Sequence, residues 1–528
     1  MKRNKIAERI LALSLMVLPF SSCTEDKMDK INADKNHPLS VSSKFIMTDI
    51  ITSTAVYGVS GDFSLYASIY MEHEAGVENQ LYNAEVRSGE PNLSATYNDM
   101  WNALYANIRR LKIVIAQCSE GGTEAGNDVT LGAAKVLYAQ NLATLTDLFG
   151  NAPFKEASEY TEEGVPAYLQ PKMDTQEEIY QAVMQYLEEA LVLLDGTDAA
   201  SVGSMGKQDL LYYKQTNGEI NQEKALWKKA AYALKARYTM RLLGRTADPT
   251  AALNTVLDCV SKSFASAEEE MKYAIYDGDS NGEYNPLFAF MYSREGIGAS
   301  QSLIKKMTDR KDPRVDQMFA NWDMVQITKA ADVFAVPNGT PVQGTENYDF
   351  SIVDWAITAP TQIISYHELL FLKAEALCRL NRASEAAPVL KEAITAAFAN
   401  LETSLNSAIY VWGIEGKASL PAELAEKYFT DNVKPLFDAD PLKEVMVQKY
   451  LAFYGASGES TEAYSDYRRL KGMNENFIEL ANPNNVTKFP LRYGYGNSDV
   501  QANNNVKEAF GDGMYVYNEP VWWAGGTR

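Results

Sequence analysis

The chain has 528 residues, of which 46% are hydrophobic, and its formal net charge is −20 at pH 7. This length and apolar content are those of a globular protein that forms one large domain or several. The negative charge argues against nucleic acids and anionic membrane surfaces as partners, because both repel an acidic protein.

The opening residues follow the order of a secretory signal peptide, which is removed from the mature protein. Four basic residues precede a short apolar stretch over residues 10–20, and Ser21, Ser22 and Cys23 follow it. Two small residues before a cysteine resemble a lipobox. We therefore expect residues 1–22 to be a lipoprotein signal peptide and the Cys23 thiol to receive a diacylglycerol; the alternative is an ordinary secretory signal with an incidental cysteine. Processing there would remove four basic residues and one acidic residue and change the net charge from −20 to −23.

Residues 23–40 are polar, with an acidic run directly after Cys23, and predict a solvated tether like that of lipoproteins exported to the cell surface. The remaining residues, 41–528, are expected to form a single domain. The cysteines of this domain are Cys118, Cys259 and Cys378. Each falls in a helical apolar pattern, so we interpret all of them as small buried hydrophobic residues rather than as a disulfide framework.

Apolar residues recur at helical spacing over much of the domain. Trp101 and Trp227 lie on such apolar faces and are expected in the core, while Gly58 and Gly61 are expected to divide the first helical stretch in two. The stretches with this period are residues 41–74, 97–117, 131–149, 175–194, 224–243, 251–260, 441–454 and 463–470. Those between 131 and 260 predict two helix pairs.

A third helix pair is expected over residues 363–398. Leu370 and Leu377 lie on one apolar face of its first helix, and a second apolar face predicts cover on more than one side. Ser384 is placed to cap the second helix, with Pro388 close enough to the start to be tolerated. A turn this short makes the two helices antiparallel. The run AEALCRLNRASEAAPVLKEAITA resembles a tetratricopeptide hairpin.

The segments between the helices are long. Residues 76–94 and 277–300 are rich in Gly, Asn, Ser and Tyr and predict loops, and residues 320–360 predict short strands. Residues 482–528 have little helical period and are expected to wrap over the surface. The predicted fold class is therefore mainly α, with a tetratricopeptide-like helical-hairpin scaffold that carries long loop insertions.

Several of these stretches together resemble the SusD/RagB family of outer-membrane nutrient-binding lipoproteins, and within it the SusD-like branch. The run YNDMWNALYANIRRLKIVI is similar to the early Trp-bearing helix of that family, TDLFGNAPFKEA to its Phe-Gly turn, and LWKKAAYALKARYTMRL to its Trp-Leu-Lys-Arg helix. The runs KDPRV, SYHELLFLKAEAL, QKYLAFYG and EAYSDYRRL follow in the order of its later elements. The resemblance extends over nearly the whole mature chain.

The resemblance implies a SusD-like fold and a lipoprotein at the cell surface that captures a glycan, or in some cases a peptide. It also implies a partner, a TonB-dependent outer-membrane transporter of the SusC-like kind, over which the protein opens and closes as a lid. Catalysis is not expected. The sequence has three histidines, far apart, and no HExxH motif, Cys–His pair or nucleophile elbow, so we expect no metal site and no cofactor.

The candidate ligand-binding residues lie in the predicted loops and near them. Tyrosine and tryptophan rings can stack on the apolar faces of sugars, and arginine can donate paired hydrogen bonds to ligand oxygens. The family builds its ligand face from loops in similar regions, after the first helices and in the middle insertion. The candidates are Tyr82, Arg87, Tyr284, Tyr292, Arg294 and Trp322. A structural role for each of them is the alternative.

Two other classes of protein remain open at this stage. A secreted glycan-cleaving enzyme would require a pair of carboxylates in one cleft. A periplasmic helical-repeat adaptor would present a concave groove to protein partners.

Overall fold

The computed structural model describes residues 41–88, 96–161, 165–279 and 283–528. The chain divides into a first unit, Met1–Ser42, and a second unit, Ser43–Arg528, which contains all the elements named below. The predicted signal peptide, the lipidation site Cys23 and the tether over 23–40 lie outside the described residues.

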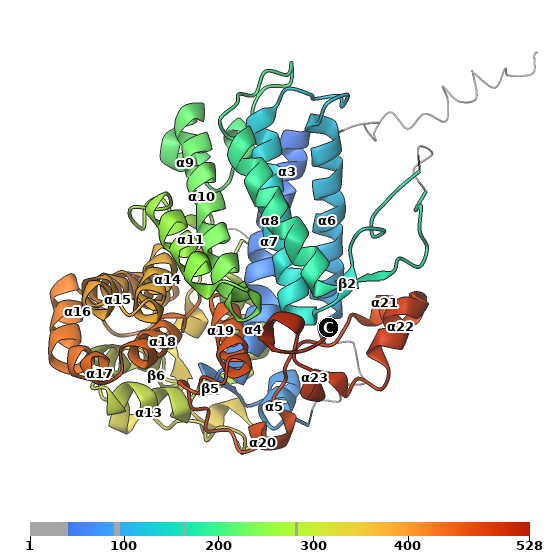
Figure 1. Cartoon of the computed structure of the whole chain (residues 1–528). Coiled ribbons are helices and arrows are strands. Elements are labelled where there is room, and N and C mark those ends of the chain that lie inside the picture. Colours follow the sequence, from blue (N-terminus) through green and yellow to red (C-terminus); the bar gives the residue numbers. More distant parts are fainter. Residues whose placement is uncertain (1–40, 89–95, 162–164, 280–282) are drawn as a thin grey trace, which may run out of the picture. The chain divides into compact units, whose positions relative to one another are not determined.

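Helices make up most of the second unit, which confirms the mainly α prediction (Figure 1). The longest are α6 (Asn98–Cys118), α7 (Asp128–Phe149), α8 (Gln176–Leu193), α10 (Ile220–Arg241), α14 (Tyr366–Arg379) and α15 (Ala383–Asn406). Shorter helices include α3 (Ser43–Ser53), α4 (Gly61–Tyr70), α5 (Asn79–Glu85), α11 (Pro249–Ser261), α12 (Pro286–Arg294), α13 (Gln301–Asp309), α18 (Pro441–Ala452), α19 (Ser460–Gly472), α20 (Asn485–Lys488) and α23 (Tyr515–Asn518).

The strands of the second unit are short and pair antiparallel. The pairs are β1 (Glu74–Gly76) with β5 (Ile297–Ala299), β2 (Ala152–Pro153) with β3 (Met173–Asp174), and β4 (Met271–Tyr273) with β9 (Thr361–Ile364). In a three-stranded sheet, β6 (Phe319–Ala320) lies between β7 (Gln326–Ile327) and β8 (Phe350–Ser351). The short strands predicted over residues 320–360 are thus confirmed.

The three predicted helix pairs form as α7 with α8, α10 with α11, and α14 with α15. Local signals set their ends. Gly150 ends α7 with φ of 80°, a conformation that suits glycine, and Thr175 starts α8 in a capping box with Glu178. The predicted core tryptophans, Trp101 and Trp227, are fully buried, and their indole nitrogens donate hydrogen bonds to aspartates.

The pair α14–α15 confirms the predicted core and corrects two details. Leu370 and Leu377 are buried, and so is the second apolar face of α14. Ile363, however, lies in β9, because Ser365 caps α14 and fixes its start after the strand. Ser384 does not cap α15: Asn381 adopts a left-handed conformation in the turn, and the helix therefore begins at Ala383.

Buried ion pairs join this scaffold across its helices. Arg237 on α10 donates to Glu368 on α14 at 2.7 Å, and Arg469 on α19 donates to Glu375 on α14 at 2.8 and 2.9 Å. All four side chains are almost completely buried. A charge that is buried in this way depends on its partner, so these pairs couple the packing of α14 to that of α10 and α19.

The C-terminal segment does not merely wrap over the surface, which corrects the prediction for residues 482–528. Arg492, Tyr493 and Tyr495 are fully buried. The Arg492 guanidinium donates to backbone carbonyls, and the Tyr493 hydroxyl donates to the backbone carbonyl of Phe63 at 2.7 Å. Contacts with distant segments, rather than helical period, place this segment in the core.

Within the described part of the chain, the predicted burial is confirmed for two of the three cysteines, and the predicted absence of disulfides among them is confirmed for all three. Cys118 and Cys259 are buried, Cys378 is half-buried, and all three are free thiols.

Candidate ligand-binding face

The two segments predicted as ligand loops lie next to each other in the structure. Strand β1, at the start of the first segment, pairs with β5, at the end of the second, so that Glu74 lies opposite Ala299. The Val77 amide also donates to the Gly296 carbonyl at 3.0 Å. Neither segment is only a loop, since α5 and α12 lie within them. The Asn285 side chain caps α12, and Pro286 occupies its first turn, so a nine-residue helix forms within the second segment.

A continuous chain of ring contacts crosses this region. We call it the aromatic chain, and it contains residues from four separate segments. Its members, in order, are Tyr284, Phe288, Tyr292, Trp412, Trp355, Phe350 and Trp322. Successive ring centroids are 5.3, 5.6, 5.6, 5.5, 6.0 and 5.0 Å apart.

Three neighbouring rings at one end of the aromatic chain reach the surface. Tyr292 is 60% exposed, and Tyr284 and Trp412 are half-buried, whereas Phe288 beneath them is 1% exposed. We call Tyr284, Tyr292 and Trp412 the aromatic platform. Each platform ring touches the buried Phe288 ring, which holds the platform in place. The platform side chains would therefore lose less conformational entropy when a ligand binds.

Trp412 enters the platform through an irregular helix end. The π-helical turn η8 (Ser407–Trp412) continues α15 and ends at Gly413, whose φ is 95°. The Ser407 hydroxyl accepts a hydrogen bond from the Thr358 amide at 2.6 Å, which ties this turn to the segment after Trp355. A π-turn inside a helix is often found at a functional site. Trp412 is not among the candidates predicted from the sequence, although a tryptophan followed by a glycine at a helix end could have indicated an exposed ring there.

The remaining candidates are placed differently from one another. Arg294 is exposed at the end of α12, with Nη1 3.5 Å from the Gln80 side-chain oxygen. Tyr82 is half-buried on α5. Trp322 is half-buried at the far end of the aromatic chain, and its indole nitrogen donates to the Tyr348 carbonyl at 2.8 Å. The structure therefore brings Tyr284 and Tyr292 into one platform and leaves Tyr82 outside it.

Arg87 is buried, with 2% of its surface exposed. Its Nη2 donates to the Asn485 side-chain oxygen at 2.8 Å, its Nη1 donates to the backbone carbonyls of Ala84 and Glu85, and its guanidinium lies 5.1 Å from the Tyr70 ring centroid. These contacts hold α5 against the C-terminal segment, and they leave Arg87 no free face toward a ligand. We therefore leave Arg87 out of the ligand face that is proposed below.

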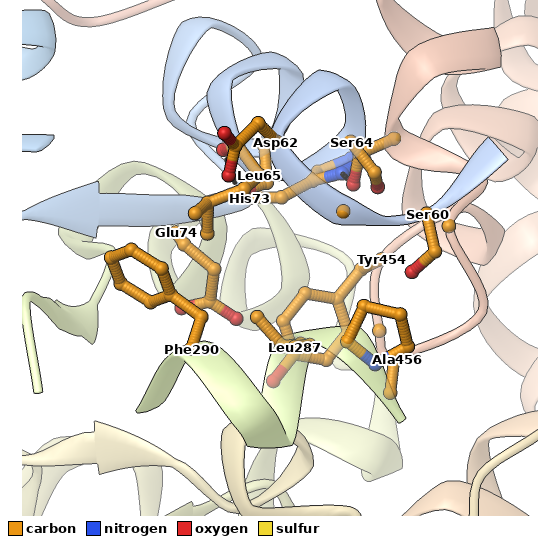
Figure 2. Close-up of a pocket in the computed structure, with 16 residues that line it drawn as sticks. Ser60, Asp62, Ser64, Leu65, His73, Glu74, Leu287, Phe290, Tyr454 and Ala456 are labelled. Carbon is orange, nitrogen blue, oxygen red and sulfur yellow. Dashed lines mark hydrogen bonds between the residues drawn. The ribbon is translucent and has the colours of Figure 1, made fainter. Parts of the chain in front are cut away.

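A small cavity lies behind α12, between α4, β1 and residues 454–460 (Figure 2). Glu74, Tyr454 and Phe290 surround it, and its volume is about 40 Å³. Ligand pockets usually measure roughly 300–1,000 Å³, whereas a water needs only about 10–15 Å³ of such space. The cavity is therefore suited to water and is too small for a sugar ring.

Two carboxyl groups at this cavity, Glu74 and Asp62, have raised pKa values. Burial raises the pKa of Glu74 well above its ordinary value, and the negative charge of nearby Asp354 raises it further. Burial also raises the pKa of Asp62, with a further rise from Asp99 and an opposing effect of the Arg294 charge. These shifts follow from the low polarity around the groups and the neighbouring negative charges.

The histidines of the domain serve as buried hydrogen-bond partners. His73 Nε2 lies 2.9 Å from the Tyr450 carbonyl and Nδ1 lies 3.1 Å from the Ser460 hydroxyl, and burial lowers the pKa of His73 to about 3. His367 Nε2 lies 2.9 Å from a Glu459 carboxylate oxygen. Across residues 41–88, 96–161, 165–279 and 283–528, no group of three or more His, Cys, Asp or Glu side chains could hold a metal ion.

Comparisons with known proteins give one consistent family. Residues 35–496 match the family model SusD-like, described as starch-binding and associating with the outer membrane. A crystal structure of a SusD/RagB family protein from Bacteroides thetaiotaomicron is 48% identical, with a TM-score of 0.86, and the match covers 93% of this chain and 100% of that chain. No curated protein matches the sequence.

More distant structures share the fold. A SusD homolog from Bacteroides fragilis is 19% identical, with a TM-score of 0.67 and coverage of 92% of this chain and 100% of that chain. A chitin-binding SusD homolog from Flavobacterium johnsoniae is 18% identical, with a TM-score of 0.64 and coverage of 91% and 98%. The predicted SusD-like fold is thereby confirmed. Among the helices in the described ranges, none has both the length and the apolar character to cross a bilayer.

Proposed function

Since the chain belongs to the SusD-like family, described as starch-binding and associating with the outer membrane, we propose that it captures a glycan at the cell surface for import. A peptide is the second ligand class that the family resemblance allows. We further propose that the protein is anchored through a lipid on Cys23 and faces the cell exterior. Its partner would be a SusC-like, TonB-dependent transporter, which it covers as a lid.

The observation that carries the glycan proposal is the aromatic platform. Tyr284, Tyr292 and Trp412 present three rings from two separate segments, and the buried Phe288 ring touches each of them. The apolar C–H faces of a sugar can stack on such rings, while polar groups at the edge bond its hydroxyls. Arg294, exposed at the end of the same helix as Tyr292, is placed to supply such bonds. Tyr82 and Trp322 would extend the contact for a longer ligand.

The geometry favours binding over cleavage. Glu74 and Asp62 line a cavity of about 40 Å³, which would not admit a sugar ring, and the raised pKa values reflect burial rather than access to a substrate. The family description, which names starch binding and the outer membrane, supports this choice over a secreted glycosidase or a periplasmic adaptor.

The test is calorimetric titration of the purified protein with malto-oligosaccharides, chito-oligosaccharides and short peptides. Tyr292→Ala and Trp412→Ala should each weaken glycan binding several-fold, because loss of one stacking ring costs about 1 kcal/mol. Tyr168→Ala is a matched control, since Tyr168 is 50% exposed on the loop between β2 and β3. Unchanged affinity in both platform variants would contradict the proposed site, and cleavage of the ligand during titration would contradict the binding-only function.

A further inference from the structure

A second pocket lies away from the aromatic platform, between α19 and the C-terminal segment. Its volume is about 330 Å³, which falls within the range of small-molecule sites. Tyr467, Arg468 and Lys471 contribute from α19, where their spacing places them along one side of the helix. Asn485, Thr487, Phe489 and Tyr517 contribute from the C-terminal segment.

The lining of this pocket is basic, although the chain as a whole is acidic. The sequence has 69 acidic and 49 basic residues, yet the described residues that line the pocket include Arg468 and Lys471 and no aspartate or glutamate. Lys471 is exposed, and its Nζ donates to the uncharged Asn476 side chain at 3.1 Å. In the part of the chain that the structure describes, Lys471 forms no ion pair.

Arg468 adds a buried positive charge to the wall. It is 2% exposed, its Nη1 donates to the Asp147 backbone carbonyl at 2.7 Å, and its guanidinium lies 4.0 Å from the Tyr464 ring centroid. Among the described residues no carboxylate oxygen lies within ion-pair distance of Arg468. The next residue on α19, Arg469, is instead paired with Glu375 at 2.8 Å.

Arg87 strengthens the same charge from behind the pocket. It donates to Asn485, which lines the pocket, and its guanidinium likewise forms no ion pair within the described ranges. Its positive charge opposes the rise that burial causes in the pKa of Tyr517, another lining residue. Burial raises the pKa of the Glu85 and Asp147 carboxyl groups, and the charge of Arg87 opposes this rise at Glu85, as the charges of Arg241 and Arg468 do at Asp147. Because these carboxyl groups lie near the two buried guanidinium groups, the exposed Lys471 ammonium supplies the main attraction for an anion.

The other walls of the pocket are aromatic. Tyr467 and Phe489 contact each other with centroids 4.9 Å apart, and Tyr517 is half-buried on α23. Rings of this kind suit the apolar face of a sugar, and the exposed Thr487 hydroxyl can bond its rim. A simple inorganic anion would contact the basic side chains but would have no apolar face to pack against the aromatic rings.

We propose that this pocket binds an acidic sugar, with the sugar ring against the aromatic walls and its carboxylate paired with the exposed Lys471 ammonium, while the buried Arg468 adds positive charge from within the wall. The site is separate from the aromatic platform and does not depend on the function proposed for it. A protein with both sites would hold a neutral stretch of glycan on the platform and an acidic sugar residue in the pocket.

The experiment is calorimetric titration of the full chain at low ionic strength with D-glucuronic and D-galacturonic acid. D-glucose and D-galactose serve as uncharged counterparts with the same rings. The acidic sugars should bind saturably and the neutral ones at least about tenfold more weakly, since a charge-assisted contact is lost. Lys471→Glu should abolish acidic-sugar binding and Lys471→Arg should retain it.

Two controls separate this site from the alternatives. Lys305→Glu changes the net charge equally at an exposed lysine on α13 and should leave binding unchanged, and so should Tyr292→Ala at the platform. Equal affinity for acidic and neutral sugars, or Lys471→Glu binding like the unmodified protein, would overturn the proposal. Inorganic phosphate that binds more tightly than the acidic sugars would also overturn it, because it would indicate a general anion site. An acetylated dipeptide with a free C-terminus that binds more tightly than the acidic sugars would indicate a peptide site instead.

Discussion

Glu375 on α14 allows the stability of the scaffold to be tested quantitatively. Its carboxylate is fully buried and accepts hydrogen bonds from Arg469 at 2.8 and 2.9 Å and from Arg379 at 2.8 Å. Replacement Glu375→Gln keeps the size of the side chain and removes its charge, which leaves two buried guanidinium groups without this counter-charge.

Two independent estimates give the size of the effect. Breaking a buried ion pair by removing one partner typically costs about 3–5 kcal/mol. Burial by itself would raise the pKa of Glu375, but the charges of Arg469 and Arg379 outweigh it and hold the pKa at about 2 instead of 4.5. A fall of this size corresponds to about 3 kcal/mol of stabilisation at neutral pH.

The pH dependence has a definite sign. A carboxyl group whose pKa is lower in the folded state stabilises the fold fully above pH 4.5, and this stabilisation is lost as the pH falls toward 2. The assay is urea denaturation at pH 7 and at pH 4. Glu375→Gln should unfold at clearly lower urea at pH 7, and its difference from the unmodified protein should shrink at pH 4.

Glu385→Gln is the matched control, because Glu385 pairs with Arg382 at 2.7 Å on the exposed start of α15. Exposed pairs contribute little, so its denaturation midpoint should not move. If Glu375→Gln had the same midpoint as the unmodified protein at pH 7, the argument that this pair couples α14 to α19 would be wrong.

Three further predictions concern the core, the anchor and the partner. Leu377→Ala on α14 should lower the free energy of unfolding by about 2–5 kcal/mol, because Leu377 is buried; an unaltered denaturation curve would show that this face is not part of the core. Cys23→Ala should move the protein from the membrane fraction to the soluble fraction, and continued membrane association would rule out lipid anchoring at that residue. Detergent-solubilised outer membranes should yield the protein together with a SusC-like transporter, and repeated elution alone while the transporter is expressed would refute the lid model.

Sequence alone determined the helical scaffold, because the signals for a helix are local. Apolar residues at a spacing of three and four predicted α7, α10 and α14. The capping box of Thr175 with Glu178, which starts α8 in the structure, is also made of residues close together in sequence. Trp101 and Trp227 could be assigned to the core for the same reason, since each lies on the apolar face of its own helix. The order of these elements along the chain also carried the family resemblance.

Only the tertiary structure decided which candidate side chains share a surface. Tyr292 and Trp412 are 120 positions apart in sequence, and their rings meet because α12 and the turn after α15 pack together. Arg87 has a local sequence typical of a loop, yet Asn485, 398 positions away, accepts its hydrogen bonds and buries it. Whether a side chain is exposed, paired or stacked depends on the distant segments that cover it, and no local pattern records which segments those are.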